Sequence, residues 1–186
     1  MKILDFIEKW PIVLMPFLVL VAIPFTVYSQ PQSTTSTAST AAEPEYSASL
    51  GLSSSEETAA VGGALEVGII LSTGEAKIDG ADAVLRYNPQ MLRFAALERG
   101  ELFEEYVQEE VDETEGCIRL SGLTLDAQPK NGTLGRITFE ALKKGTTTVF
   151  FEFTPGATKG DSNVALSGAG GVDILKEVQN GIYIIE

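Results

Sequence analysis

Apolar and polar residues alternate in short stretches along the C-terminal two thirds of the chain. In the clearest of these, Ile137 and Phe139 share one face of an extended strand while Arg136, Thr138 and Glu140 share the other. Similar stretches recur about every 8–12 residues, separated by turn residues, and few segments have the period of a long helix. This pattern predicts an all-β fold, an antiparallel β-sandwich.

We expect about nine strands in this part of the chain, from the runs of apolar residues and their alternation. They cover residues 65–71, 81–87, 91–96, 106–111, 116–121, 134–142, 146–153, 164–166 and 181–185. Gly74 and Glu75 are predicted to end the first strand, because this pair is typical of a turn. Residues 131–132 and 143–145 are predicted to form hairpin turns, and residues 102–106 a short helical turn.

The N-terminal part of the chain has a different pattern. Residues 11–28 are almost wholly apolar and carry no charge. As a helix they would span roughly 27 Å, close to the ~30 Å of a bilayer's hydrocarbon core. Lys2 and Lys9 precede this run, and no Lys or Arg follows until Lys77. Because basic residues stay on the cytoplasmic side, we expect everything after the segment 1–29 to be exported.

Two fates remain open for this apolar segment. Val27 and Ser29 place small or short residues before Gln30, as signal peptidase prefers, and cleavage there would give a secreted protein. The run is longer than the ~7–15 apolar residues usual in a signal peptide. Its length therefore favours a retained helix, which would make this a single-pass protein of the cell membrane with an extracellular domain.

Residues 30–63 are rich in Ser, Thr and Ala and poor in large apolar side chains. Such a segment buries too little apolar surface to offset its chain entropy, so we predict a disordered linker. It would hold the domain predicted over residues 64–186 clear of the membrane. A domain of about 120 residues is large enough to form one hydrophobic core.

Composition excludes several classes of function. The chain of 186 residues has a net charge of −13, which argues against nucleic acid or anionic lipid as a partner of the domain. It has no histidine, the commonest general base and transition-metal ligand. Cys117 is the only cysteine, so no intramolecular disulfide forms, and we expect it to pack as a small apolar residue.

Three other features could carry chemistry, and each has a simpler explanation. The acidic residues between 98 and 115, and the Asp161-Ser162-Asn163 segment, contain ligands suited to calcium but no Asp-x-Asp-x-Asp-Gly loop. A solvated acidic edge, which keeps the domain monomeric, accounts for the first of them. Ser167 lacks the Gly-x-Ser-x-Gly context and a histidine to activate it. We therefore predict no metal site, no cofactor and no catalysis.

Three stretches of the predicted sandwich resemble, in order and spacing, those of one known family. Residues 79–94 are similar to a strand ending in Tyr-Asp-Pro that an apolar strand follows, with Asn88 in place of the usual Asp. Residues 132–142 resemble a Gly-Leu-Ile-Phe-Ala strand, and residues 178–185 resemble a closing strand. Together they resemble the cohesin domain, the β-sandwich receptor module of cellulosomes, which implies a jelly-roll sandwich and a non-catalytic binding function.

The resemblance also implies a partner and a face. In cohesins the outward face of the strand at residues 81–87 helps to bind dockerin, a small calcium-binding module, and a family Asp falls on Asp82. Calcium, where it is needed, would then belong to the partner rather than to this chain. The expected contact residues are Asp82 and Arg86, with Arg119 and Ser121 on a neighbouring strand.

Two alternatives stay open. Carbohydrate-binding modules have the same sandwich, so the domain could bind polysaccharide directly, although Trp10 is the only Trp and lies beside the apolar segment. A structural role in a surface assembly would need no ligand. With the protein partner, the expected setting is polysaccharide degradation or cell-surface attachment.

Overall fold

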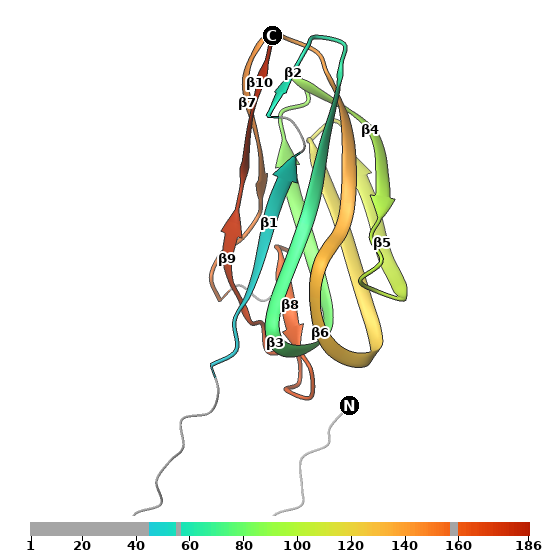
Figure 1. Ribbon diagram of the computed structural model, residues 1–186, viewed down its shortest axis with the longest axis vertical. Coiled ribbons are helices and arrows are strands. Elements are labelled where there is room, and N and C mark those ends of the chain that lie inside the picture. Colours follow the sequence, from blue (N-terminus) through green and yellow to red (C-terminus); the bar gives the residue numbers. More distant parts are fainter. Residues whose placement is uncertain (1–44, 55–56, 157–159) are drawn as a thin grey trace, which may run out of the picture. The chain divides into compact units, whose positions relative to one another are not determined.

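The computed structural model describes residues 45–54, 57–156 and 160–186. In this part of the chain all regular structure is β, in ten strands joined by hydrogen bonds (Figure 1). The strands are β1 (Ala48–Ser54), β2 (Thr58–Ala59), β3 (Ala64–Tyr87), β4 (Leu92–Arg99), β5 (Glu105–Asp112), β6 (Cys117–Ala141), β7 (Gly145–Phe151), β8 (Asn163–Leu166), β9 (Leu175–Gln179) and β10 (Gly181–Ile185). The all-β prediction is confirmed.

Two long antiparallel strands, β3 and β6, organise the sandwich. They pair from Ala64 opposite Glu140 to Arg86 opposite Cys117. The first half of β3 pairs with β1, and the last part pairs with β8 and then β7. In β6 the first half pairs with β5 and the second half with β4. The strands therefore form two layers, and the long strands belong to both (Figure 1). The first layer has the order β9–β1–β3–β6–β4. In the second layer β6 pairs with β5 and β3, β3 pairs with β8 and β7, and β7 continues to β10 and β2.

The predicted turns at residues 74–75 and 131–132 are wrong, because both lie inside the long strands. The register between β3 and β6 shifts between Ser72 and Lys77, and Gly74 has a φ of 55° there. Asn131 Oδ1 accepts hydrogen bonds from the backbone N–H groups of Thr73 and Gly74 at 3.0 and 3.2 Å. The turn-type residues thus form an irregularity within continuous strands, and four predicted strands merge into two.

Two smaller predictions are also wrong. Residues 102–106 form no helical turn: they lead into β5, which begins at Glu105. The 143–145 segment joins β6 to β7, but these strands pair with other partners and not with each other. It is therefore a connection between layers rather than a hairpin turn.

The predicted boundary at residue 64 is wrong, since β1 and β2 lie within the segment expected to be a disordered linker. In β1 the side chains of Ala48 and Leu50 are 3% and 1% exposed, while Ser49 and Gly51 between and after them are half-buried. This is an ordinary strand alternation, hidden in a Ser-rich composition. The predictions for residues 1–29 and 30–44 lie outside the described residues, and within the described ranges no helix is long and apolar enough to cross a membrane.

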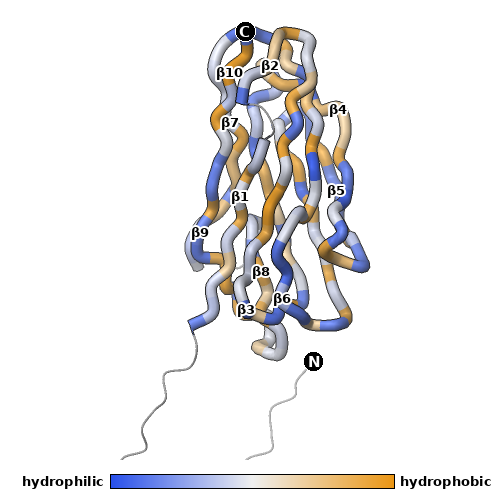
Figure 2. Tube along the Cα trace, viewed as in Figure 1, coloured by the Kyte–Doolittle hydropathy of each residue, from blue (hydrophilic) through white to orange (hydrophobic). Residues whose placement is uncertain are grey.

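The core lies between the two layers. Figure 2 shows apolar and polar residues alternating along the strands, as a sandwich with one buried face per layer requires. The rings of Tyr87 and Phe139 pack with centroids 4.9 Å apart, and Cys117 is a buried free thiol, as expected. The largest fully buried side chains are Leu50, Leu65, Ile69, Leu71, Ile78, Leu85, Leu92, Ile118, Leu120, Leu134, Ile137 and Phe139.

Candidate partner-binding face

The structure brings the four predicted contact residues onto one face. Asp82 lies directly opposite Ser121 on the paired strand, and Arg119 and Arg86 occupy the next two rows. Residues two apart on a strand, and their direct cross-strand partners, point to the same side of a sheet. The intervening side chains of β3 and β6, among them Leu85 and Leu120, are fully buried in the core. The four residues therefore face away from the core.

This face continues onto the strands that flank β3 and β6. On β5, Gln108, Glu110 and Asp112 lie opposite Ser121, Arg119 and Cys117, and on β8, Asn163 lies opposite Asp82. We call the outward-pointing surface of β8, β3, β6 and β5 the outer face. It comprises Asn163, Ala165, Gly80, Asp82, Val84, Arg86, Cys117, Arg119, Ser121, Leu123, Glu105, Gln108, Glu110 and Asp112.

Both arginines of the outer face are held by carboxylates of the same chain. Glu152 directly follows β7, and its Oε1 lies 2.9 Å from Arg86 Nε. This hydrogen bond raises the pKa of the Arg86 guanidinium. Arg119 Nη1 lies 3.7 Å from Glu110 Oε2 on β5. Each arginine thus has a carboxylate beside it before any partner arrives.

A polar network surrounds Asp82 and Ser121. Asn163 Nδ2 donates to Asp82 Oδ2 at 2.8 Å, which orients that carboxylate. Ser121 Oγ donates to Gln108 Oε1 at 3.4 Å, and Gln108 Nε2 donates to Glu110 Oε2 at 3.0 Å. Ser121 is only 6% exposed, so its hydroxyl positions Gln108 more than it offers a contact of its own.

Ser162 is a site residue that the sequence did not reveal. It is 1% exposed, and its Oγ accepts a hydrogen bond from Val84 N at 3.0 Å and donates to Val84 O at 3.3 Å. Along β3, pairing with β8 ends at Asp82 and pairing with β7 begins at Leu85. Ser162 fills the gap between them and fixes the backbone between Asp82 and Arg86.

The calcium interpretation of the segment around Asp161 gains no support. Asp161 Oδ2 accepts a hydrogen bond from Thr154 N at 2.9 Å, which closes the loop before β8. Within the part of the chain that the structure describes, no group of three acidic, cysteine or histidine side chains could hold a metal ion.

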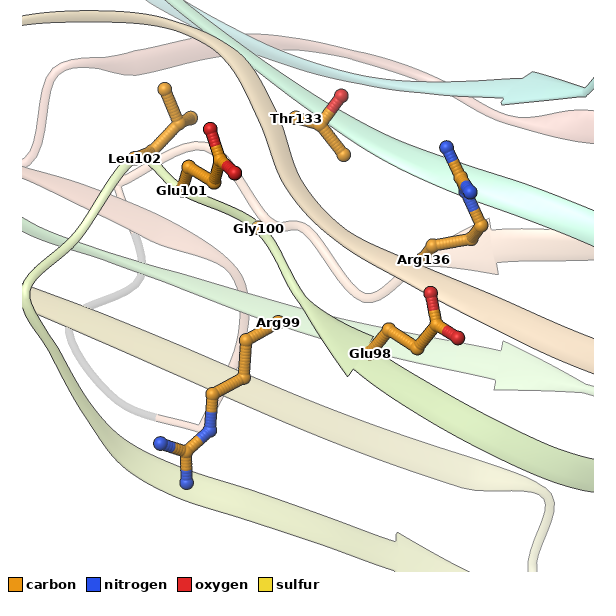
Figure 3. Close-up of a pocket in the computed structure, with 7 residues that line it drawn as sticks. All are labelled: Glu98, Arg99, Gly100, Glu101, Leu102, Thr133 and Arg136. Carbon is orange, nitrogen blue, oxygen red and sulfur yellow. The ribbon is translucent and has the colours of Figure 1, made fainter.

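A hollow of about 570 Å³ lies elsewhere, beside β4 and the second half of β6. In Figure 3, Glu98 and Arg136 project from neighbouring strands, while Glu101, Leu102 and Thr133 line the other end. None of the predicted contact residues lines this hollow. It is separate from the outer face.

Comparison with protein families decides the assignment. The cohesin domain model matches residues 50–173, which is more than half of the chain. The chain belongs to the cohesin domain family. Cohesins are non-catalytic protein-interaction modules, so this cohesin domain is not an enzyme. None of the curated proteins matches the chain.

Solved structures give the same fold. A type II cohesin–X–dockerin complex from Acetivibrio cellulolyticus is 20% identical, with a TM-score of 0.58 over 75% of this chain and 99% of that one. A type II cohesin domain from the cellulosome of the same organism is 18% identical, with a TM-score of 0.60 over 74% and 95%. A type I cohesin–dockerin complex from Clostridium thermocellum is 17% identical, with a TM-score of 0.60 over 75% and 99%.

The folded cohesin domain extends beyond the match to the family model. The matched range ends at Asp173, before β9 and β10. Yet β9 pairs with β1, and β10 pairs with β7 from Gly181 to Ile185. Both strands therefore complete the two layers of the sandwich and belong to the domain.

Proposed function

We propose that this cohesin domain binds a dockerin-like protein module through its outer face, in polysaccharide degradation or cell-surface attachment. The observation that carries the proposal is the convergence of Asp82, Arg86 and Arg119, all half-buried, on the outward-pointing surface of β3 and β6. Two of the structures with this fold are described as cohesin–dockerin complexes, which adds support. Rigid paired strands present these side chains, as a preformed docking surface requires.

The proposal includes a location. Residues 11–28 would form the single membrane span and leave the domain outside the cell, or would be removed to give a secreted protein. Any calcium would lie in the dockerin, because its own loops would bind it. The cohesin domain would then act as a receptor at the end of a polar linker.

Titration calorimetry of the chain against a panel of dockerin modules, each with calcium and with chelator, tests the proposal. Binding of at least one calcium-loaded dockerin, lost on chelation, is expected. Asp82→Arg should weaken that binding at least tenfold without lowering the melting temperature, while Glu177→Arg on β9, which is exposed and off the outer face, should leave affinity unchanged. Unchanged binding by Asp82→Arg would remove Asp82 from the interface.

Direct binding of polysaccharide has less support. Sugar-binding surfaces commonly present aromatic rings that stack on the sugar. Among the described residues the exposed aromatic side chains are Tyr46 and Phe150, 39% and 41% exposed, and they lie on different strands or segments. If no dockerin binds and an insoluble polysaccharide retains the chain, the protein-partner proposal is wrong and the glycan alternative replaces it.

A further inference from the structure

We infer that the partner meets the outer face with a cationic surface flanked by an apolar side chain. This inference rests on the proposed function and specifies the chemistry of the partner.

The carboxylates of the outer face outnumber its cations. Asp82 points outward from β3, and Glu105 and Asp112 point outward from β5; in the described ranges none of them forms an ion pair. Glu113 and Glu115 follow in the turn between β5 and β6 and are exposed. A surface of this kind keeps a negative potential that extends about a Debye length, ~8 Å at physiological salt.

The two arginines do not reverse this sign. Arg86 is hydrogen-bonded to Glu152, and Arg119 lies beside Glu110, so each cation is offset by a carboxylate of the same chain. An anionic partner would have to separate these pairs and would meet the remaining carboxylates. A partner with Lys or Arg side chains would find acceptors already oriented, such as Asp82, whose Oδ2 is held by Asn163.

An apolar patch borders the carboxylates. Leu123 lies opposite Gly80 on one side and Glu105 on the other, and it is 44% exposed. Leu125, in the irregular part of β6 that follows, is 99% exposed. Large apolar side chains next to a polar surface are typical of the contacts that hold a bound partner. We assign this patch to the apolar side chain of the partner.

Stopped-flow association of a dockerin that binds in the calorimetric panel tests the charge assignment. The association rate constant should fall at least tenfold between 50 and 500 mM NaCl, because exposed charges are screened. Glu105→Lys and Asp112→Lys should each lower it two- to fivefold at 50 mM. Glu177→Lys on β9 makes the same change of net charge off the outer face and should alter it far less.

The apolar contact is tested by dissociation. Leu125→Asn should raise the dissociation rate constant about tenfold, whereas Val61→Asn, at an exposed apolar residue between β2 and β3, should leave it unchanged. Association that is insensitive to salt, or equal effects of Glu177→Lys and Asp112→Lys, would overturn the inference while leaving dockerin binding intact. Failure of every dockerin to bind would instead reject the proposed function.

Discussion

Replacing Ser162 with alanine should destabilise the domain, although the change removes a single oxygen atom. Ser162 Oγ is the acceptor for Val84 N at 3.0 Å, in the gap where neither β8 nor β7 pairs with β3. In the variant this N–H stays buried without a partner. Val84 O keeps its hydrogen bond from Glu152 N at 2.8 Å, so only one backbone group is lost.

A buried backbone group without a partner costs about 1–3 kcal/mol, so we expect Ser162→Ala to lower the free energy of unfolding by about 2 kcal/mol. For a domain of this size the melting temperature should fall by roughly 4–10 °C. Urea unfolding followed by circular dichroism measures the difference, with Ser47→Ala, at an exposed serine outside the strands, as the control. If Ser162→Ala unfolds at the same urea concentration as the wild type, the hydroxyl is not the support we describe.

Three further predictions concern the stability of the domain. The buried Tyr87 hydroxyl has no hydrogen-bond partner among the described residues. Tyr87→Phe should therefore raise the free energy of unfolding, measured by urea unfolding, by up to about 1 kcal/mol. A decrease would show that the hydroxyl has a hydrogen-bond partner. A Cβ at Gly100 would lie 1.9 Å from Thr133 O, so Gly100→Ala should cost about 1–3 kcal/mol by the same assay, and a neutral result would contradict the packing. Burial raises the pKa of Tyr183 to about 12, whereas the phenol of the unfolded chain ionises near pH ~10. The free energy of unfolding should therefore fall as the pH rises from ~10 to about 12. Tyr183→Phe should reduce this alkaline loss of stability, measured by urea unfolding followed by circular dichroism.

Strand alternation was enough to predict the fold class and most of the strands. Ile137 and Phe139, whose alternation is the most regular in the chain, are fully buried in β6 as expected. The same rule placed Asp82 and Arg86 on the side opposite Leu85, and the register then joined them to Arg119 and Ser121. Local periodicity settles which face a side chain occupies, because the period of a strand is two residues.

What failed depended on partners distant in sequence. Gly74 and Asn131 have the chemistry of turns, but Asn131 lies opposite Ser72 and accepts a hydrogen bond from Gly74 N, which produces an irregularity within the long strands. Leu50 is buried because β1 pairs between β3 and β9 and this side chain packs in the core. Ser162 supports Val84 across 78 positions of the chain. No local pattern marks the roles of Asn131 and Ser162, since composition and alternation do not report which strands become neighbours.

The place of β1 has a mechanical consequence. It is the first strand among the described residues, and it is hydrogen-bonded along both of its sides, from Ser49 to Ser54 with β3 and from Ala48 to Gly51 with β9. A pull on the chain ahead of Ala48 therefore acts along the axis of this strand and loads many transverse hydrogen bonds at once, in shear, rather than opening them one after another. We therefore expect the domain to resist tension that enters through the chain ahead of β1.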